Sequence, residues 1–326
     1  MFYLLFYQLI LRLVYGQVRK SQKATFSGVI STSMLFSANI LASLTVIVLK
    51  PKRYSHMMTK INNLKNISSR YFADNNNTKS IGISIILLHL WYGLVTHNDI
   101  ALFKSGWLVT IHSYVYDSQM RYRWLIQNIY MCVLVQEVYG VLRSFNDLLK
   151  AWIKDRNVLE LNQEILQDFC KIFVEYNEIV LSFNDVFGGI LFLSLLNYFY
   201  IILTLSTSIT SLIAGYKVHW AYPTNVAMLL TYATVGAISI ASICDKTTKE
   251  AQKTSGLAYN LLYSLSLNRS RQDQRLLMDC LVQLIKQSTH LCPKFSAADF
   301  FPVDYSTLFV LMNLLASYVV VLIQFE

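Results

Sequence analysis

The residue types that most often carry enzymatic chemistry are scattered along this 326-residue chain. The sequence contains no GxxxxGK[ST] phosphate-binding loop, no GxSxG nucleophile elbow and no HExxH zinc helix. Its five cysteines form no CxxC pair, and its six histidines lie far apart. One HxC pair, His290 and Cys292, lacks the second pair of ligands that a zinc site needs. The sequence therefore predicts that the chain is not an enzyme and has neither a cofactor nor a metal centre.

Two carboxylates border long apolar stretches and are the residues best placed for ion or proton chemistry. Ionisable residues inside a membrane are expensive and often functional. Glu137 lies near the end of its apolar run, and Asp185 comes just before another run. Both can reach a basic partner or water from there. We therefore favour ordinary ion pairing for both, since proton-coupled transport needs a deeper relay of ionisable groups.

The composition is typical of a membrane protein with several spans. Apolar residues make up 54% of the chain and charged residues only 14%, against about 25% charged residues in soluble domains. These values exclude a disordered chain, a collagen-like chain and a disulfide scaffold. The net charge of +9 would suit nucleic-acid binding in a soluble protein. Here the basic residues fall between apolar runs, so they indicate membrane topology and no nucleic-acid partner.

The apolar runs predict an all-α fold with seven transmembrane helices in a single domain, 1–326. A run that crosses a bilayer must be helical, because lipid offers no partners to open backbone groups. The stretch 102–116 carries Lys104 and His112, and we expect a structured loop there, with an eighth span as the alternative. The predicted spans are residues 1–16, 26–49, 81–96, 124–142, 186–215, 225–244 and 305–325.

The basic residues predict the orientation of these spans. Of the 28 Lys and Arg residues, 20 fall in the three loops that follow the second, fourth and sixth runs. The positive-inside rule then places the N-terminus inside and the C-terminus outside. Three glycosylation sequons, at Asn66, Asn76 and Asn268, fall on the predicted cytoplasmic side and should stay unmodified. Amphipathic patterns over about 143–183 and 246–300 predict cytoplasmic anchor helices, with helices lying on the membrane surface as the alternative.

The end of the chain carries a short signature. Ser317 and Tyr318 are followed by five apolar residues and then by Gln324 and Phe325. This pattern resembles the TYhhhhhQF signature of insect gustatory receptors, in which h is apolar, with Ser317 replacing Thr. Residues 176–188 and 294–304 resemble the family's entries to the fifth and seventh spans. Family members usually have Gly near Asp299.

The resemblance implies a function as well as a fold. Gustatory receptors are related to insect odorant receptors and act as multi-pass, ligand-gated, non-selective cation channels of the plasma membrane. The resemblance implies a homo- or hetero-tetramer, opened by a small-molecule tastant, whose cytoplasmic helices form an anchor. The seventh span lines the pore, and Gln324 and Phe325 contribute to the gate. Helical periodicity places Asn313, Ser317, Val321 and Gln324 on one broad face, which suits a pore lining.

The expected ligand pocket is aromatic with a few polar groups, which suits small ligands such as sugars or bitter alkaloids. An interfacial aromatic belt or ordinary core packing is the alternative for each of its residues. The residues expected to line the pocket are Trp91, Tyr92, His97, Trp124, Gln127, Tyr130, Asn197, Tyr198, Tyr200 and Tyr232.

Three other functions compete with this interpretation. A receptor of the G-protein-coupled class is suggested by Asp155-Arg156-Asn157, which resembles the DRY triplet, but the triplet follows the fourth run and the seventh run has no NPxxY. A transporter would need a deep ionisable site and often repeated halves. A nonsensory relative of the gustatory family remains the third alternative.

Overall fold

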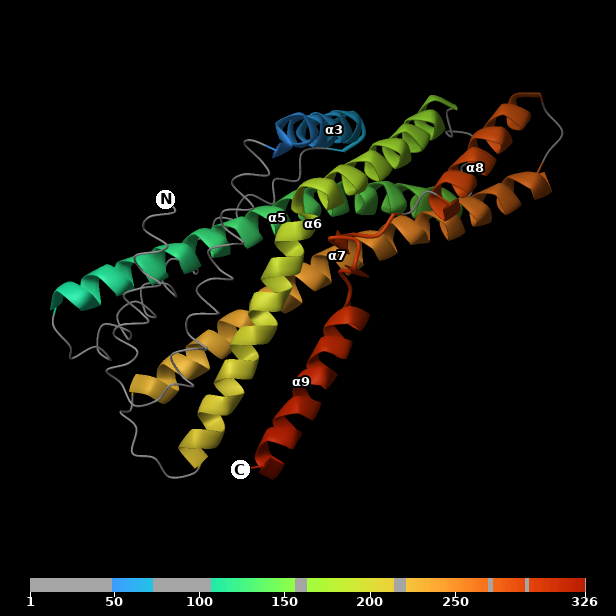
Figure 1. Ribbon diagram of the computed structural model, residues 1–326. Helices are drawn as coiled ribbons and strands as arrows, with labels where there is room; N and C mark the ends of the chain where they lie inside the picture. The colour runs from blue at the N-terminus through green and yellow to red at the C-terminus, as the bar shows by residue number, and fades with distance from the viewer. Residues whose placement is uncertain are drawn as a thin grey trace.

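Long helices dominate the computed structural model of the chain, shown in Figure 1. The structure describes residues 49–72, 107–155, 163–213, 221–268, 272–290 and 293–325. Within these ranges one short hairpin separates the last two helices. The elements are α3 (Pro51–Ser69), α5 (Trp107–Asp155), α6 (Gln163–Ile213), α7 (Ala221–Asn268), α8 (Gln272–His290), β1 (Ser296–Ala297), β2 (Phe301–Pro302) and α9 (Tyr305–Phe325).

The helical fold predicted from composition is confirmed. The apolar runs 124–142 and 225–244 lie within α5 and α7, and the run 305–325 coincides with α9. The run 186–215 lies in α6 as far as residue 213. The runs 1–16 and 81–96 lie outside the described residues, as does the run 26–49 apart from Leu49. Two helical segments in the described ranges, Tyr122–Lys154 and Glu164–Phe199, are long and apolar enough to cross a bilayer.

Two local predictions differ from the structure. The loop predicted over 102–116 is wrong from Trp107 onward, because α5 begins there and runs without a break to Asp155. Polar residues such as His112 interrupt the apolar pattern without ending the helix, since neither Pro nor Gly follows Trp107 in this stretch. The helices predicted to about residue 300 end at His290, and residues 296–302 form the hairpin.

The three longest helices exceed the thickness of a bilayer. α5, α6 and α7 contain 49, 51 and 48 residues, so each would be roughly 72–77 Å long at about 1.5 Å per residue. The hydrocarbon core of a bilayer is only about 30 Å thick. Figure 1 shows α5 and α7 running alongside each other, with α8 near the far end of α7 and α3 beside α6.

Aromatic side chains form much of the core between α5 and α6. The rings of Phe145 and Phe169 meet edge-to-face, with centroids 4.5 Å apart and planes at 77°. Phe183 packs edge-to-face on Phe295, at 5.2 Å and 89°. Edge-to-face pairs add about 0.5–1.5 kcal/mol beyond the burial of their area. The first pair joins α5 to α6, and the second joins α6 to the segment that precedes β1.

Ion pairs bind the basic helix α3 to its neighbours. Lys60 Nζ lies 2.8 Å from Glu178 Oε2, and Lys65 Nζ lies 2.9 Å from Glu137 Oε2. Lys50 bonds to the carboxylate of Asp185. Both carboxylates singled out in the sequence therefore pair with α3, which confirms the simpler of their two interpretations.

The hairpin packs against α6 and leads into α9. The side chain of Asn184 accepts a hydrogen bond from Ser296 N at 2.9 Å and donates one to the carbonyl of Lys294 at 2.9 Å. Ala298 and Asp299 have φ values of 53° and 60°, in the left-handed region that favours glycine. At Gly188 a Cβ would lie 3.0 Å from the Ala298 nitrogen, so glycine permits this close approach. The hairpin thereby fixes where α9 begins.

Candidate functional site

A buried polar cluster lies between the apolar halves of α5 and α6. Trp124 Nε1 donates a hydrogen bond to Ser194 Oγ at 2.9 Å. Asn128 Nδ2 donates one to the Tyr198 hydroxyl at 3.2 Å. The rings of Trp124 and Tyr198 lie 4.6 Å apart and are tilted by 46°. We call Trp124, Asn128, Ser194, Asn197 and Tyr198 the α5–α6 cluster.

This cluster contains polar atoms that lack hydrogen-bond partners. Asn197 is fully buried, and neither atom of its amide has a partner among the described residues. Asn128 Oδ1 and Gln127 Oε1, both on α5, are also buried without a hydrogen-bond partner among the described residues. A buried polar group without a partner costs about 1–3 kcal/mol. Such groups call for water or a bound molecule.

Gly236 of α7 makes room for Tyr198. A Cβ at Gly236 would lie 2.1 Å from the Tyr198 hydroxyl oxygen and 2.5 Å from its Cζ. These distances are far below van der Waals contact, so only glycine allows the ring to reach α7. The hydroxyl that Asn128 contacts is therefore held between three helices.

Tyr198 also lines an apolar cavity of about 70 Å³. Tyr198 belongs to both the α5–α6 cluster and the wall of this cavity. A change in the cluster could therefore reach α9 through a single side chain. The cavity is lined from α6, α7 and α9 by Leu195, Tyr198, Phe199, Ile202, Thr234, Ala237, Ile238, Leu308, Leu311 and Met312.

The structure brings together part of the predicted pocket. Trp124 and Tyr198 are in contact, and Gln127 lies on the same stretch of α5. Tyr130 does not join them, because its hydroxyl bonds to that of Tyr54 on α3. The side chain of Tyr232 lies outside the described residues, as do Trp91, Tyr92 and His97.

Sequence reasoning missed three members of the site, namely Asn128, Ser194 and Gly236. The missing signal was helical spacing, because Trp124 and Asn128 are four residues apart and so are Ser194 and Tyr198. Residues at this spacing share one helix face. Gly236 could not be found in this way, since its role depends on a ring from another helix.

Most of the α9 surface is exposed. Asn313 and Ser317 are exposed on one face, and Ser317 Oγ donates a hydrogen bond to the Asn313 carbonyl at 2.9 Å. Apolar side chains are exposed around them, and large exposed apolar surfaces mark membrane or protein contacts. The side chains of Val321, Gln324 and Phe325 lie outside the described residues, although their backbone belongs to α9. The exposed apolar residues of α9 include Phe309, Val310, Met312, Leu314, Tyr318 and Val320.

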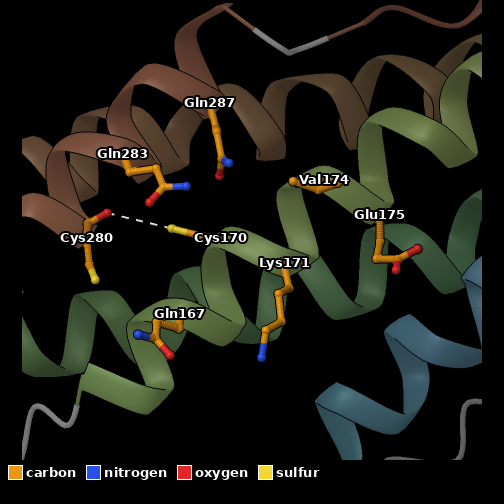
Figure 2. A pocket seen from close by; sticks show the side chains of 8 residues that line it. All are labelled: Gln167, Cys170, Lys171, Val174, Glu175, Cys280, Gln283 and Gln287. Atoms are coloured by element: carbon orange, nitrogen blue, oxygen red, sulfur yellow. Dashed lines mark hydrogen bonds between the residues drawn. The ribbon is translucent and has the colours of Figure 1, made fainter.

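A second, polar cleft between α6 and α8 gathers no reactive set of groups. Figure 2 shows that Cys170 points its sulfur at the carbonyl of Cys280, at 3.6 Å, rather than at the second thiol. Of its charged residues, Lys171 pairs with Asp168 and Glu175 with Lys60. Because its ionic groups are already matched, this cleft is a polar helix contact and not a candidate catalytic site.

Comparisons with known proteins agree with the helical fold. Two solved structures of the insect olfactory receptor OR5 from Machilis hrabei are similar, one of them in complex with eugenol. The TM-scores are 0.68 for the complex and 0.65 for the other structure, at 12% and 11% sequence identity, covering 99% of this chain and 87% of each OR5 chain. No curated protein sequence matches. The model of the 7tm chemosensory receptor family matches residues 1–326, and the chain therefore belongs to that family.

Proposed function

We propose that this chain is a gustatory-type receptor that acts as a ligand-gated, non-selective cation channel of the plasma membrane. A small-molecule tastant binds inside each subunit, and four subunits, alike or mixed, surround a pore lined by α9. Seven spans place the N-terminus inside and the C-terminus outside. The helical ends of α5, α6 and α7, together with α8, form a cytoplasmic anchor. The family membership and the likeness to olfactory receptor OR5 support this proposal.

The observation that carries the proposal is the mixed exposed surface of α9. Its 21 residues carry no charged side chain, so the helix suits a bilayer. Yet Asn313 and Ser317 are exposed on one face, and polar side chains at membrane depth normally face a bundle interior or a water-filled cavity. Four copies of this face around an axis would give a largely apolar pore with polar rings. Such a pore can gate by excluding water.

The α5–α6 cluster supplies the ligand-binding part of the proposal. Asn197 offers a donor and an acceptor without partners among the described residues, next in sequence to Tyr198, whose ring contacts that of Trp124. A small molecule with an apolar or aromatic body and one or two polar groups fits this chemistry. Eugenol, bound by OR5, belongs to that class. Displacement of Tyr198 by a ligand would change its packing near Leu308 and Met312 on α9.

The orientation can be tested with an epitope tag at the C-terminus. Antibody staining of intact, unpermeabilised cells is the expected result, since an odd number of spans puts the chain end outside. Staining only after permeabilisation, with surface expression shown independently, would contradict the orientation and favour the G-protein-coupled class. Glycans on Asn66 would contradict it as well.

The gate can be tested at Gln324. We expect Gln324→Ala to change conductance or gating at unchanged surface expression, because this polar ring would lie in an otherwise apolar pore. Single-channel recording from the full chain measures the effect. Gln252→Ala, at an exposed position of α7, is the matched control and should behave like wild type. Unchanged currents in Gln324→Ala would remove Gln324 from the gate.

A further inference from the structure

The start of α3 carries a concentration of positive charge. Lys50, Lys52 and Arg53 follow directly on the apolar run 26–49. The side chains of Lys50 and Arg53 are 37% and 66% exposed, and Lys52 is exposed as well. The residues of α3 include no Asp or Glu. This end of the helix therefore presents cations to the surroundings with no acidic neighbour on the same element.

Only one carboxylate opposes these cations among the described residues. Lys50 Nζ bonds to the side chain of Asp185 and, at 2.7 Å, to its backbone carbonyl. Arg53 Nε lies 3.6 Å from the same carboxylate. In the described part of the chain Lys52 has no ion pair. The exposed Lys294 lies nearby, because its carbonyl accepts a hydrogen bond from Asn184.

The rest of α3 differs in its charge balance. Lys60 pairs with both Glu175 and Glu178, and Lys65 pairs with Glu137. Each cation there faces at least one carboxylate. The surplus of positive charge is thus confined to the end of α3 that adjoins the apolar run.

The backbone adds to this positive potential. Lys50 is the N-cap of α3 and makes no side-chain capping bond, and Pro51 occupies the first turn. The amino-terminal end of a helix carries a partial positive charge that favours anions. The three cations and the uncapped start of the helix therefore contribute to the same region of positive potential.

We propose that Lys50, Lys52 and Arg53 bind the phosphorylated headgroup of an anionic phospholipid, of the phosphoinositide class, in the leaflet next to α3. Basic clusters immediately beside a membrane span attract anionic lipids. Several phosphate groups on one headgroup can meet several cations at once, which a single exposed ion pair cannot do. Under the orientation proposed above this leaflet is the cytoplasmic one, but the binding itself depends on neither orientation nor channel activity.

Binding can be measured on the purified full chain in detergent, by thermophoresis with a short-chain phosphatidylinositol bisphosphate. Lys52→Gln/Arg53→Gln should weaken binding at least fivefold, while thermal unfolding stays unchanged. The control, Arg275→Gln/Lys286→Gln, makes the same charge change at exposed positions of α8 and should bind like wild type. Equal affinity of wild type and the α3 variant, or equal weakening in both variants, would overturn the proposal.

A third variant gives an effect of opposite sign. Asp185→Asn removes the carboxylate that occupies Lys50 and Arg53, so phosphoinositide should bind more tightly. Unchanged or weaker binding in a folded Asp185→Asn protein would contradict the assignment. Free inositol trisphosphate tests whether a soluble phosphate ligand, rather than a lipid headgroup, is bound. Binding as tight as that of the lipid would overturn the lipid assignment in favour of a soluble ligand.

Discussion

Two fully buried asparagines, Asn146 and Asn197, stand in opposite situations. The amide of Asn146 donates to the carbonyl of Glu250 at 2.8 Å and to its carboxylate at 3.0 Å, and it accepts from Thr254 Oγ1 at 2.6 Å. Lys253 completes this network through the Glu250 carboxylate. Asn197 has no hydrogen-bond partner for either amide atom among the described residues. The same residue type, equally buried, is thus satisfied in one region and left open in the other.

A paired buried amide and an unpaired one have different physical consequences. A buried polar network with every group paired fixes how two helices meet, and it loses stability when one member is removed. An unpaired buried amide costs stability until another molecule pairs with it. The α5–α7 contact at Asn146 therefore holds the long helices in register, and the open amide of Asn197 is the feature on which the proposed ligand site rests.

The largest effect is expected at Asn146. Asn146→Ala would leave the Glu250 carboxylate and the Thr254 hydroxyl without their buried partner. We expect the free energy of unfolding to fall by roughly 2–4 kcal/mol. Chemical unfolding of the purified protein in detergent measures this change. A loss below about 0.5 kcal/mol, the range of ordinary surface substitutions, would contradict the structural role.

Gly236→Ala comes next. The added Cβ would overlap the hydroxyl of Tyr198, so either the ring or α7 must move. Overpacking of this kind costs about 1–3 kcal/mol, and we expect the ligand response to change as well. Gly256→Ala is the control, since an added Cβ there meets nothing within 4 Å. Equal stability of the two variants would show that Tyr198 is not wedged against α7.

A smaller effect concerns the pH dependence of stability. Burial alone would raise the pKa of Glu250, but hydrogen bonds from Lys253 and Asn146 and the charges of Lys253 and Lys150 outweigh it and lower the pKa. A carboxylate with a lowered pKa in the folded state stabilises the fold above its unfolded pKa, about 4.3 for Glu. This stabilisation is lost as the pH falls through the folded-state pKa.

The measurement is thermal unfolding between pH 3 and pH 7, where Glu250→Gln should lack this part of the pH dependence. Identical pH profiles for wild type and Glu250→Gln would contradict the assigned network.

Asn197→Leu should have the smallest effect on stability and a large one on function. Replacing an unpaired amide by an apolar side chain of similar size should change the free energy of unfolding by less than about 1 kcal/mol. The concentration of agonist needed for half-maximal current should rise at least tenfold, because a ligand loses its polar partner. An unchanged agonist response would remove Asn197 from the ligand site.

The sequence was informative about helices and less so about their ends. Apolar runs located α9 to the residue, because this helix is bounded by polar residues and carries no charge. The start of α5 was placed too late. Where this helix extends beyond its apolar stretch, its polar side chains give the mixed pattern that is also typical of a loop. The hairpin at 296–302 was missed for a different reason. Its turn uses Ala298 and Asp299 at positive φ instead of the glycine that would have marked it.

The candidate site was only partly predictable. Trp124 and Tyr198 were found because aromatic residues stand out in apolar runs. Their contact, and the approach of Tyr198 to Gly236, depend on how three helices cross, which a single sequence does not encode locally. The same holds for the open amide of Asn197, because lacking a partner is a property of the packed structure.

The most direct test of the account is whether water reaches the polar face of α9. Asn313→Cys and Ser317→Cys should be modified by a charged thiol reagent applied to open channels, and the current should fall. Leu311→Cys, on the face that lines the apolar cavity, should not respond, and wild type controls for the native cysteines. Equal protection of Asn313→Cys, Ser317→Cys and Leu311→Cys, in variants that still carry agonist-evoked current, would contradict an α9-lined pore.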